Sequence, residues 1–204
     1  MERERIRKTL RAGDYVLRGL KVGDTDDLYQ ILSDRESTMW FEWHHPIRKY
    51  KEVKSFVKRH SFYDSGWFGY GEGDGEDMVC THFKDYELAV TFHDRLIGYI
   101  GVSKYFEDKR AVLHYIMNKK WRCRGAMTAA VKSMCKDIFD DGNTQTIQIE
   151  ALDINVPSCR VAEKCGFRMT DKTSIFCYMD HDFKIFELTK QDFKSLASNT
   201  EKAA

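Results

Sequence analysis

The sequence contains very little proline, the residue that most often interrupts helices and strands, and its positive and negative charges almost cancel. Only 2 of its 204 residues are proline. The 33 basic and 32 acidic residues leave a formal net charge of +1, so no strong field draws the chain toward phosphate backbones or anionic lipids. We therefore expect no nucleic acid and no membrane among its partners.

The sequence also lacks long apolar runs and closely spaced CxxC cysteine pairs. No apolar run reaches the length needed to span a membrane, and residues 1–11 alternate Glu with Arg and Lys, which is not typical of a secretory signal. The spacing of His and Cys predicts no metal site. We expect a cytoplasmic protein with reduced thiols, because no CxxC pair occurs among the six cysteines, Cys80, Cys123, Cys135, Cys159, Cys165 and Cys177.

The apolar residues that are present predict alternating strands and helices. A period of two predicts strands at residues 15–20, 87–92, 96–102, 111–117 and 146–152, with two more within 174–188. A helical period predicts a helix capped by Asp24, one that buries Val53, Phe56 and Val57, one that follows Gly125, and one at 157–165 ended by Gly166.

The length favours one domain. We expect a charged arm at residues 1–13, a single domain at 14–194 and a disordered tail at 195–204. Within the domain, residues 65–84 are rich in Gly and acidic residues and are predicted to form an inserted loop. This loop either recruits a cationic substrate or is simply a solvated loop.

Two motifs carry the chemistry. Residues 121–127 (WRCRGAM) lead into a helix, and a helix N-terminus preceded by Gly favours anion binding, because its first N–H groups lack internal partners. Residues 155–167 (NVPSCRVAEKCGF) follow one strand later and contain Asn155, Ser158 and the run Glu163-Lys164-Cys165-Gly166-Phe167.

Together the two motifs resemble the coenzyme A-binding core of the GCN5-related N-acetyltransferase (GNAT) superfamily. Residues 15–26, 113–117 and 183–193 are similar to its RimJ/RimL branch. The resemblance implies an α+β GNAT fold: a central mixed, mostly antiparallel, twisted sheet of about seven strands flanked by helices on both faces. The sequence departs from the pattern at Met127, where a small residue is usual, and at Val112 and His114.

The resemblance implies an N-acetyltransferase that moves the acetyl group of acetyl-CoA onto a primary amine by direct attack in a ternary complex. The amine would be a protein N-terminus or a polyamine-like small molecule; an antibiotic amine is not distinguished from these. A homodimer is an open alternative to a monomer. A non-catalytic acetyl-CoA-binding sensor or interaction domain of the same fold is the second reading, kept open by Met127, Val112 and His114.

The resemblance also assigns residues to acetyl-CoA. A bulge is expected to splay the strand at 111–117 from the strand at 146–152, so that backbone groups face the pantetheine arm and one N–H stabilises the oxyanion. The expected contacts are Tyr115, Ile116, Met117, Arg122, Cys123, Arg124, Gly125, Ala126, Met127, Thr128, Asn155, Ser158 and Lys164. Met127 would then have to point away from the phosphates.

Catalytic roles follow from the chemistry of amines and thioesters. An alkylamine with a pKa of about 10 must lose a proton before it attacks, and Glu150 is the first candidate base. Glu150 is alternatively an ordinary surface carboxylate, with the proton passing to a water held by Glu42, His44 or His45. The leaving thiolate benefits from a proton donor, and the resemblance to RimL-like enzymes implies this role for Ser158, unless its hydroxyl only caps a helix. Tyr115 and Tyr178 are fallback donors, and direct transfer requires no nucleophile such as Cys159.

Overall fold

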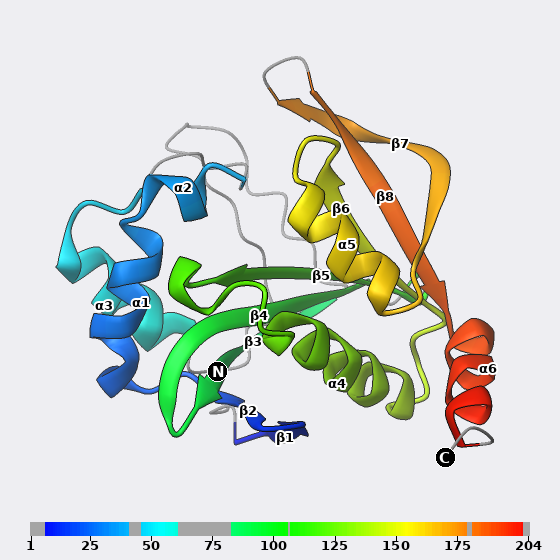
Figure 1. Ribbon diagram of the computed structural model, residues 1–204, viewed down its shortest axis with the longest axis horizontal. Coiled ribbons are helices and arrows are strands. Elements are labelled where there is room, and N and C mark those ends of the chain that lie inside the picture. The colour runs from blue at the N-terminus through cyan, green and yellow to red at the C-terminus, as the bar shows by residue number, and fades with distance from the viewer. Residues whose placement is uncertain (1–6, 41–45, 61–82, 106, 179–180, 202–204) are drawn as a thin grey trace.

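Eight strands form one sheet in the computed structural model, which describes residues 7–40, 46–60, 83–105, 107–178 and 181–201 (Figure 1). The strand order is β1-β2-β3-β4-β5-β6-β8-β7. The β5–β6 pair is parallel and the other neighbours are antiparallel. The strands are β1 (Thr9–Ala12), β2 (Tyr15–Gly19), β3 (Phe83–Phe92), β4 (Arg95–Tyr105), β5 (Arg110–Met117), β6 (Thr146–Leu152), β7 (Arg168–Tyr178) and β8 (His181–Thr189).

The helices cover both faces of this sheet (Figure 1). Six α-helices and two short 3-10 helices occur in the described residues. They are η1 (Val22–Asp24), α1 (Thr25–Leu32), α2 (Arg35–Thr38), α3 (Tyr50–His60), η2 (Lys119–Trp121), α4 (Ala126–Asp140), α5 (Val156–Lys164) and α6 (Lys190–Glu201). The expected α+β class and the mostly antiparallel sheet with helices on both faces are confirmed.

Each end of the described chain contains an element that the sequence analysis did not predict. Within the expected charged arm, Thr9–Ala12 forms β1 and pairs with β2, because Leu10 packs on the core and Ala12 is buried. This strand raises the count from the expected seven to eight. Most of the expected disordered tail belongs to α6, whose Phe193 ring stacks near Phe139 with centroids 5.2 Å apart.

Asp24 has a different role from the predicted cap. It precedes α1, but no helix N–H donates to its side chain. Its two carboxylate oxygens instead accept from Nη1 and Nη2 of Arg18, each at 2.8 Å, in a largely buried ion pair. The backbone N–H of Lys21 also donates to Asp24, at 2.7 Å, so this carboxylate ties β2 to η1.

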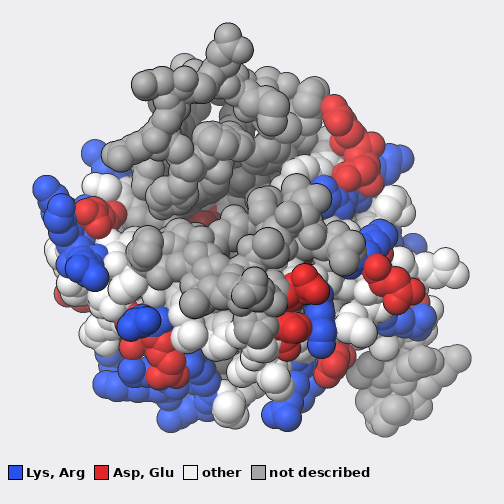
Figure 2. Space-filling model, turned by 90° about the horizontal axis from the view of Figure 1, so that it is seen from above, with Lys and Arg blue, Asp and Glu red and all other residues white. Residues whose placement is uncertain are grey.

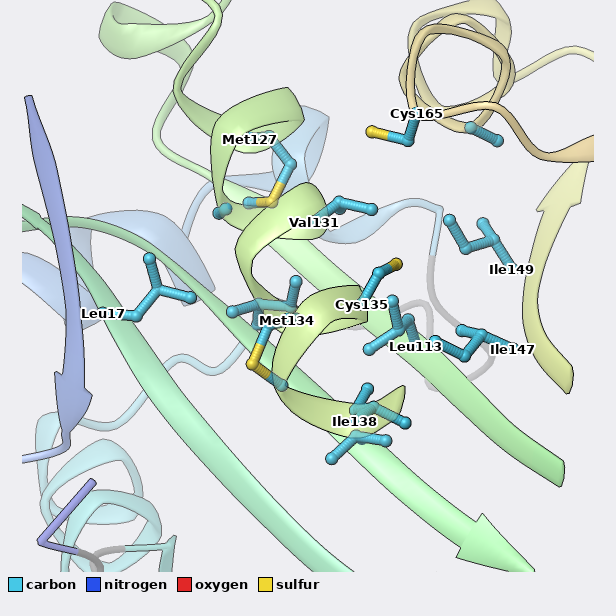
Figure 3. Packing of buried hydrophobic residues seen from close by; sticks show 14 of the residues in the cluster. Leu17, Leu113, Met127, Val131, Met134, Cys135, Ile138, Ile147, Ile149 and Cys165 are labelled. Atoms are coloured by element: carbon cyan, nitrogen blue, oxygen red, sulfur yellow. The ribbon is translucent and has the colours of Figure 1, made fainter. Parts of the chain in front are cut away.

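The two faces of the sheet bury separate clusters. The larger lies under α4 and α5, and Figure 3 shows Val131, Met134 and Ile138 of α4 pointing into it with Leu17 and Leu113 of the sheet. The smaller lies under α1 and α3 and contains the predicted face Val53, Phe56 and Val57. This segregation follows from the period-two alternation of side chains along each strand.

The β5 and β6 strands pair over only part of their length. Four register pairs join them, from Arg110↔Thr146 to Leu113↔Ile149, and beyond these the strands diverge (Figure 1). The expected bulge is not present, because β5 stays in unbroken register with β4 up to Gly98↔Met117. β6 likewise stays on β8 along its whole length. The divergence therefore falls between two intact halves of the sheet.

The surface carries both signs of charge. Lys and Arg lie interspersed with Asp and Glu over the described part of the face in Figure 2. This distribution is what the near balance of 33 basic and 32 acidic residues leads one to expect. Among the described residues, no helix has both the length and the apolar character needed to cross a membrane.

Candidate active site

A cavity of about 360 Å³ opens where β5 leaves β6. Its walls come from the end of β5, the turn before α4, the first turn of α4 and the inner face of α5. All thirteen residues expected to contact acetyl-CoA line it: Tyr115, Ile116, Met117, Arg122, Cys123, Arg124, Gly125, Ala126, Met127, Thr128, Asn155, Ser158 and Lys164. The structure thus brings together two motifs that a helix and a strand separate in the sequence.

The turn before α4 has the backbone shape of an anion site. Gly125 is its N-cap residue with a left-handed φ of +78°, and Cys123, two residues earlier, has φ +61°. The first backbone hydrogen bond of α4 runs from the N–H of Ala129 to the carbonyl oxygen of Gly125 at 2.9 Å. The N–H groups that precede Ala129 in the first turn lack an intrahelical acceptor, and the helix dipole is positive at this end.

Gly125 is required by conformation rather than by crowding. A Cβ placed on it would meet no atom within 4 Å, so the space in front of the turn is open. A side chain there would disfavour the left-handed φ and would occupy the space through which a phosphate must approach. Both effects favour glycine at this position.

Met127, the main departure from the family pattern, does not block the turn. Met127 is 7% exposed as a residue and belongs to the cluster under α4. Figure 3 shows it in the first turn of α4, among the buried side chains of this cluster. Its burial agrees with the expectation that it points away from the phosphates.

The two arginines of the turn are held differently. Arg122 Nη1 donates to Glu36 Oε1 at 2.7 Å and its Nη2 donates to Ser37 Oγ at 2.9 Å, so its guanidinium is tied to α2. The Arg124 guanidinium lies 4.9 Å from the centre of the Trp121 ring. The backbone carbonyl of Arg124 accepts a hydrogen bond from Tyr15 Oη at 3.1 Å. Arg122 therefore positions α2, whereas Arg124 stacks beside the cavity.

Tyr115 and Ser158 form a hydroxyl pair on the cavity wall. Tyr115 Oη lies 2.9 Å from Ser158 Oγ and donates to the Ser158 carbonyl at 3.3 Å. Burial raises the pKa of the Tyr115 phenol far above its usual range. The Tyr115 phenol therefore stays protonated at physiological pH.

Asn155 fills the capping role at the start of α5. Its side-chain oxygen accepts from the N–H of Ser158 at 3.3 Å, and Pro157 stands in the first turn. The amide holds the backbone of Ser158 and thereby fixes the hydroxyl beside Tyr115. The Ser158 hydroxyl itself bonds to Tyr115, so the alternative in which that hydroxyl caps the helix is not what the structure shows.

The cysteines of the site are thiols. Four described cysteines, Cys123, Cys135, Cys159 and Cys165, are free of disulfides. Burial raises the pKa of the Cys159 thiol, and it raises that of Cys165 to about 12. Thiols held protonated are poor nucleophiles, which disfavours an acyl-enzyme on Cys159. No three His, Cys, Asp or Glu side chains gather into a metal site in the described part of the chain.

Several cavity residues were not predicted. Arg160 lies one helical turn before Lys164 on α5, and neither side chain forms an ion pair with another described residue. In the sequence, the i, i+4 spacing of Arg160 and Lys164 could have indicated that both side chains lie on one face of the helix, near Ser158. The other unpredicted wall residues are Ser37, Trp40, Trp121, Pro157 and Val161. Ser37 and Trp40 come from distant segments, which no local pattern could reveal.

The remaining predicted residues are not part of the cavity wall. Glu150 lies on β6, paired with Ile185, and does not line the cavity. The expected acceptor residues Glu42, His44 and His45, like most of the insert at 65–84, lie outside the described residues. The expected acetyl-CoA contacts therefore lie together in the cavity, and the expected base Glu150 lies apart from them.

Comparison with known families gives one match. The model described as an acetyltransferase (GNAT) domain matches residues 15–168, which is most of the chain. No curated protein matches the sequence significantly.

Solved structures share the fold at low identity. A GNAT-family acetyltransferase from Bacillus anthracis superposes with a TM-score of 0.70 at 17% identity, covering 90% of this chain and 99% of its own. RimL, a ribosomal L7/L12 α-N-protein acetyltransferase solved with coenzyme A, superposes with a TM-score of 0.70 at 12% identity, covering 89% of this chain and 98% of its own. AAC(6')-Ib, solved with ribostamycin and coenzyme A, superposes with a TM-score of 0.64 at 17% identity, covering 89% of this chain and 97% of its own. At these identities the likeness concerns the fold.

Proposed function

The chain belongs to the GNAT family of acetyltransferases, and from that premise we propose that it acetylates a primary amine of a protein N-terminus or of a polyamine-like small molecule. Acetyl-CoA is the acetyl donor. The transfer is direct, within a ternary complex. The reaction needs no nucleic acid and no membrane, and a cytoplasmic location and a homodimeric state are further parts of the proposal that await a test.

One observation carries the donor half of the proposal: the left-handed turn at Gly125 opens into the cavity beside the start of α4. The pyrophosphate of acetyl-CoA needs several donors with little bulk between them, and the first N–H groups of α4 supply such donors. Arg160 and Lys164 on α5 add positive charge to the same cavity. The donor would therefore extend from this turn toward the diverging end of β5.

The end of β5 is suited to the acyl arm. Tyr115, Ile116 and Met117 line the cavity, and they follow the last β5–β6 register pair. Backbone groups that have lost their strand partner can bond to an extended ligand as a strand would. An N–H at this edge would also stabilise the negative charge that develops on the acetyl oxygen.

The hydroxyl pair completes the donor side. As the amine nitrogen bonds to the acetyl carbon, the carbon–sulfur bond breaks and its electron pair passes to sulfur. Ser158 would protonate this thiolate and take a proton from Tyr115, 2.9 Å away. A proton from solvent then returns both hydroxyls to their starting state.

The alternative of a non-catalytic sensor loses part of its support. It rested on the departures at Met127, Val112 and His114, and the Met127 side chain is buried in the core rather than placed against the phosphate site. The Tyr115–Ser158 pair, in contrast, is the kind of proton donor that a sensor does not need.

The test combines binding and turnover. Calorimetry with acetyl-CoA measures the donor site, and free thiol release measures transfer to three probes: a serine-terminated peptide, spermidine and an aminoglycoside. We expect binding, and turnover with the peptide or with spermidine. Binding without turnover of any amine would favour the sensor, and absence of binding would overturn both readings.

A further inference from the structure

We propose that His114 is the general base of the transfer and that Glu87 orients it. This inference rests on the proposed function, since it assigns the group that removes a proton from the attacking amine. His114 is one of the positions at which the sequence departs from the family pattern, and the donor cavity does not include it.

The position of His114 in the sheet is the first argument. It directly follows Leu113, the last β5 residue that pairs with β6, and directly precedes Tyr115 on the cavity wall. It therefore stands at the point where the strands separate. A thioester held along the exposed end of β5 would lie beside this point.

The face of the sheet is the second argument. Leu113 and Tyr115 contact the cluster under α4, whereas Ile116 belongs to the cluster under α1 and α3. Side chains alternate along a strand, so His114 lies on the same face as Ile116 and opposite Tyr115. The proton donor for sulfur and the base for nitrogen would thus flank the reacting carbon from opposite faces.

The contact with Glu87 is the third argument. His114 Nε2 lies 3.3 Å from Glu87 Oε1 across the intervening strand β4. The Glu87 side chain is 6% exposed, while that of His114 is 37% exposed. A buried carboxylate that accepts from Nε2–H fixes the ring and its tautomer, and Nδ1 then carries the lone pair that accepts a proton.

Gly101 makes this contact possible. It lies between the two residues in register, opposite Glu87 on β3 and opposite His114 on β5. A Cβ at residue 101 would approach His114 Cε1 to 2.6 Å and Glu87 Cγ to 2.9 Å. Glycine at this position therefore leaves room for the imidazole to reach the carboxylate.

Glu150 is the competing base, and it lies on the same face. Continuing the register past Leu113↔Ile149 would place it opposite His114, across the divergence. The two side chains thus lie on the face of the sheet away from α4. We assign the proton transfer to His114 because Glu87 holds its ring and because it directly precedes Tyr115 on the cavity wall, whereas the strand that carries Glu150 diverges from β5 at this point.

The step balances with the groups named. The amine nitrogen forms its bond to the acetyl carbon while His114 Nδ1 takes a proton from that nitrogen. The carbon–sulfur electron pair leaves on sulfur, which is protonated from Ser158. His114 then releases its proton to solvent, and acetylated amine and coenzyme A leave.

The test measures kcat and acetyl-CoA binding for the full chain with the best amine from the panel of peptide, spermidine and aminoglycoside. We expect His114→Gln to lower kcat by about a hundredfold or more, with the dissociation constant for acetyl-CoA unchanged. His93→Asn, in the exposed turn between β3 and β4, is the matched control and should keep the wild-type rate.

Two further measurements separate catalysis from folding. Imidazole added to His114→Ala should restore part of the lost rate, which a purely structural role would not allow. Glu87→Gln should lower kcat alone, and it should add little to the loss in His114→Gln because both changes remove the same function.

The contrary outcomes are distinct. Wild-type kcat in His114→Gln overturns the assignment, and a large loss in Glu150→Gln alone would transfer the role to Glu150. Either result leaves the acetyltransferase intact. A wild-type protein that binds no acetyl-CoA, or turns over no amine, overturns the proposed function and the His114 assignment with it.

Discussion

The Tyr115 hydroxyl lies 2.9 Å from the Ser158 hydroxyl, and this contact joins β5 to α5 across the mouth of the divergence between β5 and β6. Asn155 fixes the Ser158 backbone from the other side. Neither hydroxyl is a strong acid alone, but two neutral hydroxyls in series can deliver a proton to a leaving thiolate.

Removal of either hydroxyl should slow the chemical step. We expect Ser158→Ala to lower kcat by about a hundredfold and Tyr115→Phe by a smaller factor, with the acetyl-CoA dissociation constant nearly unchanged. The double variant should be no slower than Ser158→Ala, because the two groups act in series. Thiol release under saturating substrates measures this, and fully additive losses would contradict the relay.

The pH dependence of kcat tests the state of Tyr115. Burial raises the pKa of this phenol above its ordinary value of 10.0, so the proton stays on the oxygen as the pH rises. We therefore expect no alkaline loss of kcat from this group between roughly pH 7 and 10. An alkaline limb below pH 10 that disappears in Tyr115→Phe would show that the phenol ionises in this range.

Gly125→Ala tests the turn before α4. A non-glycine residue in the left-handed region costs about 1–2 kcal/mol, and the added methyl group would stand in the open space in front of the turn. We expect acetyl-CoA to bind at least about tenfold more weakly by calorimetry.

Gly142→Ala is the matched control for this change. Gly142 has a similar φ of +85°, its Cβ would also meet no atom within 4 Å, and it lies just beyond the far end of α4. Its substitution should cost comparable stability with unchanged acetyl-CoA affinity. Equal weakening of binding in both variants would mean that general destabilisation, not the turn, sets the affinity.

Arg122 and Arg160 should differ in how strongly they affect acetyl-CoA. The Arg122 guanidinium is already held by Glu36 and Ser37 of α2, so Arg122→Gln should raise the KM of acetyl-CoA less than Arg160→Gln does. Arg160→Gln should raise the KM of acetyl-CoA, by about tenfold. Steady-state kinetics with each substrate varied distinguishes them, and a reversed pattern would return Arg122 to the phosphates.

The sequence predicted the local elements near the donor site well. The strand at 146–152 matches β6, and the helix at 157–165 matches α5 within one residue. Periodicity, Gly125, Pro157 and Gly166 act locally, so their effect can be read from neighbouring residues. The strand β1 and the helix α6 were not predicted, because packing on distant parts of the fold, such as α4 for β1, stabilises them.

The acceptor side could not be predicted in the same way. His114 and Glu87 are 27 residues apart in the chain and meet only because β3, β4 and β5 are in register across Gly101. In the sequence, Glu150 is marked by its place near the end of a strand, whereas His114 is marked only by its departure from the family pattern. The register of a sheet is a tertiary property that single-strand patterns do not determine.

The most direct test of acetyl-CoA binding at the Gly125 turn is the change in backbone amide shifts when acetyl-CoA is added to ¹⁵N-labelled protein. We expect the largest changes at the first turn of α4 and at the end of β5, with the N–H groups of Ala126, Met127 and Thr128 foremost. Unchanged amides in this turn under saturating acetyl-CoA would contradict the assignment of the donor site.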